Sequence, residues 1–229
     1  MLDRLPYFLL MYPLLLLSLS FHEAAHAWMA DRYGDPTARL MGRISLNPIR
    51  HIDPIGTFLL PAIAMLTGAR LIGWGKPVPV NPLNLRNPRK DNLWISALGP
   101  FSNIALACLF AALAWILVTF DPTMRYTMVR SFNLFIMKGA VTFGTKEILG
   151  IIIIMGVILN LTLAIFNLIP IYPLDGGGII RGLLPEEQVP KFDAVAKYGI
   201  IILLALLITN TLRYVFIPVN YLTDLLLPF

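Results

Sequence analysis

Charged residues are scarce in this chain of 229 residues: they make up 14% of it, whereas soluble domains usually carry about 25%. Hydrophobic residues make up 57%, so there are too few polar side chains to cover a soluble core of this size. The apolar runs also reach about 20 residues, the length that spans a bilayer as a helix. These features disfavour a soluble α/β protein with buried parallel strands and predict an all-α polytopic membrane protein.

Cysteine and histidine are rare as well. The single cysteine, Cys108, excludes an intrachain disulfide, and its position in an apolar run is typical of a small packing residue. No internal repeat, low-complexity tract or second soluble domain is visible, so we expect one membrane-embedded domain over residues 1–229. The net charge of +5 does not indicate nucleic-acid binding, because the basic residues lie between apolar runs, where they orient membrane helices.

Five apolar segments divide the chain. We predict a core of three helices and a separate C-terminal helix, over about 5–30, 93–120, 148–169 and 198–217. The remaining segment, 55–72, is shorter and is interrupted by Pro61, so we expect it to form a re-entrant pair of short half-helices.

The polar connections carry a weaker signal. Apolar and basic residues partly alternate over 37–47, and four prolines between 73 and 92 exclude a helix there. We therefore expect short membrane-associated β-strands at 37–47 and 76–80. Residues 123–146 favour a helix that lies along the outer membrane interface.

The basic residues predict an orientation. Residues 31–92 hold nine of the 18 Lys and Arg and 174–197 hold three more, whereas 121–146 hold four. By the positive-inside rule, 31–92 and 174–197 face the cytoplasm of a cell whose inner membrane the protein crosses several times. Both ends of the 55–72 segment then lie on the cytoplasmic side.

The end of the first helix carries the strongest motif, His22-Glu23-Ala-Ala-His26. Residues at i and i+4 share one helix face, so both imidazoles can reach one metal ion, and Glu23 can accept a proton from a water molecule beside it. Unpaired, these groups would cost several kcal/mol in hydrocarbon, so a merely polar helix end is a poor explanation. The pattern predicts a zinc site with Glu23 as general base.

A hydrolytic zinc site needs a third protein ligand. His51 lies in a polar turn, where a surface histidine is more common than a ligand. Asp175 follows a membrane segment, in a stretch that two prolines and three glycines unwind. It could equally cap a helix that begins near Gly177, so spacing alone leaves its role open.

Three motifs together resemble the site-2 protease family of intramembrane zinc metalloproteases. They are His22-Glu23-x-x-His26, Gly99-Pro100-x-x-Asn103 and Asn167-x-x-Pro170-x-x-Pro173-Leu174-Asp175-Gly176. The resemblance implies a three-helix catalytic core that binds one Zn²⁺ per chain. It also implies cleavage of transmembrane segments of other membrane proteins, as in regulated intramembrane proteolysis. The chain resembles a short prokaryotic member without a PDZ domain.

The resemblance also assigns roles to single residues. It implies that Asp175 is the third zinc ligand and that Asn167 holds the substrate backbone. Asn167 could instead bond to the helix backbone that Pro170 leaves open. Asn103 is expected to orient a helix or the site, or to contact substrate, and Gly99-Pro100 also fits a helix start.

The substrate must be unwound before hydrolysis, and an exposed strand edge can hold an extended peptide. We expect the strands at 37–47 and 76–80 to act as this clamp, with the N–H of Val78 available between two prolines. The alternative is a plug that only seals the site. A membrane metal or proton transporter is the competing function, but it would be expected to show inverted repeats.

Overall fold

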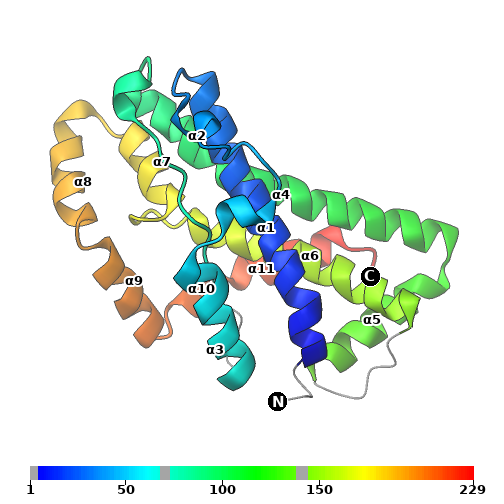
Figure 1. The fold of residues 1–229 in the computed structure, drawn as a ribbon. Helices are drawn as coiled ribbons and strands as arrows, with labels where there is room; N and C mark the ends of the chain where they lie inside the picture. The colour runs from blue at the N-terminus through cyan, green and yellow to red at the C-terminus, as the bar shows by residue number, and fades with distance from the viewer. Residues whose placement is uncertain (1–4, 68–72, 138–143) are drawn as a thin grey trace.

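The computed structural model describes residues 5–67, 73–137 and 144–229, and these are largely helical (Figure 1). The longer helices are α1 (Leu5–Arg32), α3 (Leu60–Thr67), α4 (Pro88–Phe120), α5 (Thr123–Ile136), α6 (Thr145–Asn167), α7 (Asp175–Leu183), α8 (Val189–Ala196), α9 (Gly199–Ile208) and α11 (Ile217–Leu226). The short helical turns are α2 (Thr37–Leu40), Pro48–His51, Pro54–Leu59, Pro82–Asn84, Glu186–Gln188 and α10 (Leu212–Val215).

Three helices, α1, α4 and α6, are long and apolar enough to cross a membrane. They agree with the predicted core helices, although α4 begins five residues before the expected start. At 1.5 Å per residue its 33 residues span about 50 Å, which exceeds the roughly 30 Å of hydrocarbon in a bilayer. The protein is therefore a multi-pass membrane protein whose central helix extends beyond the apolar layer.

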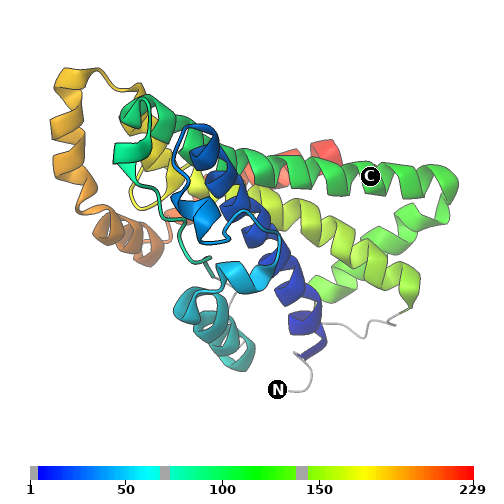
Figure 2. The same ribbon diagram turned by 45° about the horizontal axis from the view of Figure 1, so that its top comes forward.

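The core lies where α4 packs against α1, α6 and α7, and α5 folds back along α6 (Figures 1 and 2). Gly156 of α6 faces the ring of Phe110 of α4, and an added Cβ there would meet ring atoms at 2.6–2.7 Å. Small residues allow such close helix approach in membranes. In both views α8 and α9 stand away from this bundle at one end, with α5 at the other.

The described part of the 55–72 segment lies beside α1. It enters as a continuous helical run over 54–67, in which Pro61 does not break the helix, and Tyr12 of α1 donates a hydrogen bond to the Thr57 carbonyl (2.7 Å). Residues 68–72 lie outside the described residues, but Gly73 is again in contact with Gly56. Residues 54–67 form one helical limb rather than two half-helices, and the re-entrant course stays a prediction.

Two expectations about elements are wrong. No β-strand occurs in 5–67, 73–137 or 144–229: residues 37–40 are helical, and 43–47 and 76–80 are extended but form no ladder. Arg43 fills the space between these segments and uses its side chain to bond the carbonyls of Lys76 and Pro77, so the backbones do not pair.

The C-terminal helix over 198–217 is also wrong as a single element. It breaks after Ile208, because Asn210 adopts a left-handed conformation (φ 57°), and the chain turns by 95° between α9 and the helices that follow. The returning α11 packs on α6, and Trp115 donates a hydrogen bond to the Leu226 carbonyl (2.9 Å). In the 123–146 segment the helix is present as α5, while residues 138–143 lie outside the described residues.

Candidate metal centre

Two histidines one turn apart on α1 meet the first residue of α7. Nε2 of His22 lies 3.0 Å from Nε2 of His26, and these atoms lie 3.2 and 3.3 Å from the two carboxylate oxygens of Asp175. Zinc bonds of about 2.0–2.2 Å at tetrahedral angles place ligand atoms roughly 3.3–3.5 Å apart. The three side chains therefore fit one zinc ion without rearrangement of the backbone.

The proton positions also fit a cation at this point. Nδ1 of His26 faces the Ile95 carbonyl (2.6 Å), and Nδ1 of His22 faces Oδ1 of Asn103 (2.7 Å). Because each Nδ1 donates to an oxygen, each neutral ring keeps its lone pair on Nε2. Oδ2 of Asp175 is buried and accepts no hydrogen bond within the described residues. Lone pairs from three groups converge on one point, and this arrangement calls for a cation there.

Asp175 does not cap a helix. It is the first residue of α7, where the N-cap position is taken by Leu174, and its Oδ2 accepts no hydrogen bond within the described residues. Gly176 brings this helix end against the carbonyls of Leu168 and Ile169, which a Cβ at that position would overlap. The glycines after Asp175 thus allow the close approach that turns its carboxylate toward the histidines.

Gly99 provides the space for the two imidazoles. It lies inside α4, which begins at Pro88, so the alternative explanation of Gly99-Pro100 as a helix start does not apply. An added Cβ on Gly99 would overlap Nε2 of His26 and lie 2.7 Å from Cε1 of His22. The sequence signals this residue only through its motif, and the reason for a glycine becomes visible only when α1 and α4 are packed together.

Glu23 is nearly buried, at 9% exposure, and forms no ion pair within the described part of the chain. Gly75, on the extended segment that returns beside α1, lies against its side chain: a Cβ there would be 3.2 Å from Oε1. One side of the Glu23 carboxylate therefore lies against the backbone at Gly75.

Arg43 fixes that extended segment and was missed by sequence reasoning. Its guanidinium is buried, at 4% exposure for the residue, and donates to the carbonyls of Arg50, Lys76 and Pro77. Because Gly75 precedes this clamp directly, the backbone beside Glu23 is anchored by Arg43.

His51 is not a surface histidine as expected, since it is 2% exposed. Its Nε2 lies 2.7 Å from the Ser45 carbonyl, and its own carbonyl accepts from the Lys76 N–H (2.8 Å). Burial lowers the pKa of the ring below its ordinary value, and the charge of Arg43 lowers this pKa further. His51 is outside the His22–His26–Asp175 cluster.

The three residues suggested as substrate contacts lie in different settings. Asn103 is fully buried and bonded to His22. Asn167 ends α6, and its amide nitrogen donates to the Leu163 carbonyl (3.0 Å). Val78 is half-buried, and no hydrogen bond within the described residues uses its N–H. All three contacts with substrate stay predictions.

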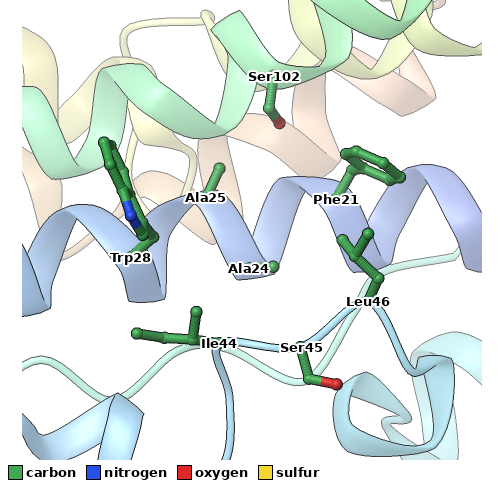
Figure 3. Close-up of a pocket in the computed structure, with 8 residues that line it drawn as sticks. All are labelled: Phe21, Ala24, Ala25, Trp28, Ile44, Ser45, Leu46 and Ser102. Atoms are coloured by element: carbon green, nitrogen blue, oxygen red, sulfur yellow. The ribbon is translucent and has the colours of Figure 1, made fainter.

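An apolar groove of about 340 Å³ runs along another stripe of α1 (Figure 3). Ile44 and Leu46 point toward α1 across it, the side chain of Ser45 points away from α1, and Ser102 borders the groove from α4. The full lining is Phe21, Ala24, Ala25, Trp28, Ile44, Ser45, Leu46 and Ser102. None of the metal-cluster residues lines this groove, so it is separate from the metal centre.

The fold and site define a polytopic membrane protein with a buried metal centre of two histidines and one aspartate. The model of peptidase family M50, the site-2 protease family, matches residues 10–209. The chain belongs to this family, and it is a zinc metalloprotease of the site-2 type.

Curated relatives agree with this assignment. The chain is 35% identical to a protein of Bacillus subtilis named "Putative zinc metalloprotease YwhC", over 89% of this chain and 82% of that protein. It is 30% identical to a protein of Mycobacterium tuberculosis and 28% identical to a protein of Mycolicibacterium smegmatis, both named "Putative zinc metalloprotease Rip2". Each Rip2 alignment covers 90% of this chain and 69% of the relative. No solved structure matches the chain.

Proposed function

We propose that this protein hydrolyses peptide bonds within transmembrane segments of other membrane proteins, with His22, His26 and Asp175 as zinc ligands and Glu23 as general base. The observation that carries the proposal is the convergence of three ligand atoms, within 4.8 Å of one another, between two apolar helices and α7. Ionisable groups at such a position are costly unless they bind a metal or pair with one another.

The ligands and Glu23 have separate tasks. When bound, zinc supplies a Lewis acid that lowers the pKa of water at the site toward about 7. Glu23 accepts a proton from the attacking water and returns it to the leaving nitrogen. The side chain can perform both steps because it neighbours His22 in sequence and is engaged in no ion pair within the described residues.

Substrate binding is proposed to use extended backbone near this site. The 76–80 segment continues from Gly75, which contacts Glu23, and it leaves the N–H of Val78 available. An unwound substrate can pair with such a segment. Asn167 is proposed to hold the substrate backbone from the end of α6, while the burial of Asn103 favours a positioning role over substrate contact.

The site is proposed to face the cytoplasm from the inner membrane of the cell, because α2, the start of α4 and the α7–α8 region, which are rich in basic residues, lie at the same end of the core as the metal centre. Cleavage there would release a cytoplasmic segment of a membrane-tethered substrate, as regulated intramembrane proteolysis requires.

A cleavage assay tests the proposal. Purified wild-type protein and Glu23→Gln are compared on candidate single-span substrates at equal zinc content. Loss of a general base removes about 10²–10⁴-fold of rate, so Glu23→Gln should be nearly inactive. Near-normal turnover by the zinc-loaded variant would contradict the role of Glu23, and a metal transporter would tolerate this change.

A further inference from the structure

Asn160 lies in the middle of α6 and is fully buried, yet it touches none of the three proposed zinc ligands. Its Nδ2 donates to the Gly156 carbonyl (2.9 Å), and its Oδ1 accepts from Nδ2 of Asn103 (2.9 Å). The same Asn103 nitrogen also faces the Ser18 carbonyl of α1 (3.2 Å). Oδ1 of Asn103 then faces Nδ1 of His22. A chain of amides therefore runs from α6 to the metal centre.

The direction of this chain is fixed by carbonyl groups, which can only accept hydrogen bonds. The Gly156 carbonyl requires the nitrogen of Asn160, so the oxygen of Asn160 faces Asn103. Two acceptors, that oxygen and the Ser18 carbonyl, then require the nitrogen of Asn103. Only the oxygen of Asn103 remains for His22, and its partner atom, Nδ1, must carry the proton.

The proton position decides whether His22 can bind a metal. A neutral imidazole with its proton on Nδ1 presents a lone pair at Nε2, the atom that faces His26 and Asp175. With the Asn103 amide reversed, an NH₂ group would face Nδ1, and the proton would move to Nε2, which could then not bind zinc.

We propose that Asn160 is a positioning residue for the metal centre: it holds the Asn103 amide in one orientation and thereby keeps Nε2 of His22 available to zinc. The inference rests on the proposed assignment of His22 as a ligand. Asn160 lies on α6, the third core helix. It acts on the ligand His22 through two hydrogen bonds, Asn160–Asn103 and Asn103–His22.

A simpler role for the same hydrogen bonds is to hold α1, α4 and α6 together, as a helix clasp. Side-chain amides often hold membrane helices together, and here they join α1, α4 and α6. Asn103→Asp separates the two roles. A carboxylate accepts from Nδ1 of His22 in either orientation, so this variant keeps the His22 proton on Nδ1. It cannot donate to Asn160 or to the Ser18 carbonyl, so the hydrogen bonds between the helices are lost.

The experiment measures zinc affinity by chelator competition on the purified protein of 229 residues, together with thermal unfolding of the zinc-free form. The variants are Asn160→Leu, Asn103→Leu and Asn103→Asp, with Asn160→Ala in reserve if the leucine does not fold. Thr162→Val is the matched control, because it removes a polar group from the same helix that bonds only the Ile158 carbonyl.

Substitution of a residue that hydrogen-bonds a metal ligand typically costs 10–100-fold in metal affinity. We expect such a loss in Asn103→Leu and a loss of about tenfold in Asn160→Leu, while Asn103→Asp and Thr162→Val stay within a few-fold of wild type. The cobalt-substituted Asn160→Leu protein should also show an altered absorption spectrum, which a helix clasp alone would not cause.

The proposal would be overturned if Asn160→Leu kept wild-type zinc affinity. It would also be overturned if Asn103→Asp and Asn103→Leu lost zinc affinity equally. In either case these hydrogen bonds would serve only to hold the helices together. His26→Ala, measured beside these variants, distinguishes a failure of the ligand assignment from a failure of the role proposed for Asn160. If His26→Ala also keeps its zinc, the ligand assignment is wrong; if it loses zinc, that assignment stands and only the role of Asn160 falls.

Discussion

At the scale of single residues, the sequence predicts the part of the site that one helix contains. His22 and His26 could be placed on one face because helix geometry sets their spacing. The surroundings of His51 depend on chain segments that are distant in sequence, and its burial could not be predicted. The same holds for Asn160, which has no motif around it and gains its partner only when α4 and α6 pack.

Gly99 gives a test at this scale. Gly99→Ala should displace both imidazoles, because the added methyl group overlaps His26 and presses on His22. We expect at least about a tenfold loss of zinc affinity, as for other disturbances around metal ligands. Gly150→Ala is the control: it adds a methyl group 3.0 Å from Met128, between α5 and α6, and should keep its zinc. Full zinc affinity in Gly99→Ala would show that the imidazoles are held differently.

At the scale of elements, long apolar helices were predictable and the irregular segments were not. Alternation over 37–47 indicated a strand, but Thr37–Leu40 forms a helical turn that ends at Gly42 with a positive φ of 68°. The extended residues beyond this turn are organised by the side chain of Arg43. A strand pattern describes local preference, whereas pairing depends on a partner backbone that the sequence does not specify.

At the same scale, backbone pairing between the 76–80 segment and substrate can be tested. Val78→Pro removes the free N–H, and Val78→Ala keeps it. One hydrogen bond contributes about 0.5–1.5 kcal/mol, so cleavage should fall several-fold in the proline variant and only slightly in the alanine variant, with zinc content unchanged in both. Because proline can also distort the backbone, a crosslink from position 78 to substrate is needed. Equal activity without a crosslink would make the segment a structural plug.

At the scale of the whole molecule, the basic connections separate as the composition predicts. α2, the start of α4 and the α7–α8 region lie at one end of the core, and the α4–α5 turn lies at the other (Figures 1 and 2). Lys146 pairs with Asp121 at that second end (2.6 Å), and the bond from its ammonium group lowers the pKa of Asp121 to about 2. The basic residues around α2 and the start of α4 are thus separated from those around the α4–α5 turn, while the sidedness of 31–92 and 121–146 stays a prediction.

Cysteine labelling tests the direction. Single cysteines replace Arg86 and Arg130, both exposed, in a Cys108→Ser background. A reagent confined to the outer face should modify position 130 and leave position 86 unmodified until the membrane is made permeable. The reverse pattern would invert the proposed orientation and place the metal centre toward the outer side.

The most direct test of the central claim is the zinc content of the purified protein, measured by mass spectrometry of the metal for wild type, His26→Ala, Asp175→Ala and Glu23→Gln. The account predicts one zinc ion per chain in wild type and in Glu23→Gln, because Glu23 is a base and not a ligand. It predicts a large loss in His26→Ala and Asp175→Ala, each of which removes one of three converging groups. Full zinc in both ligand variants would contradict the account.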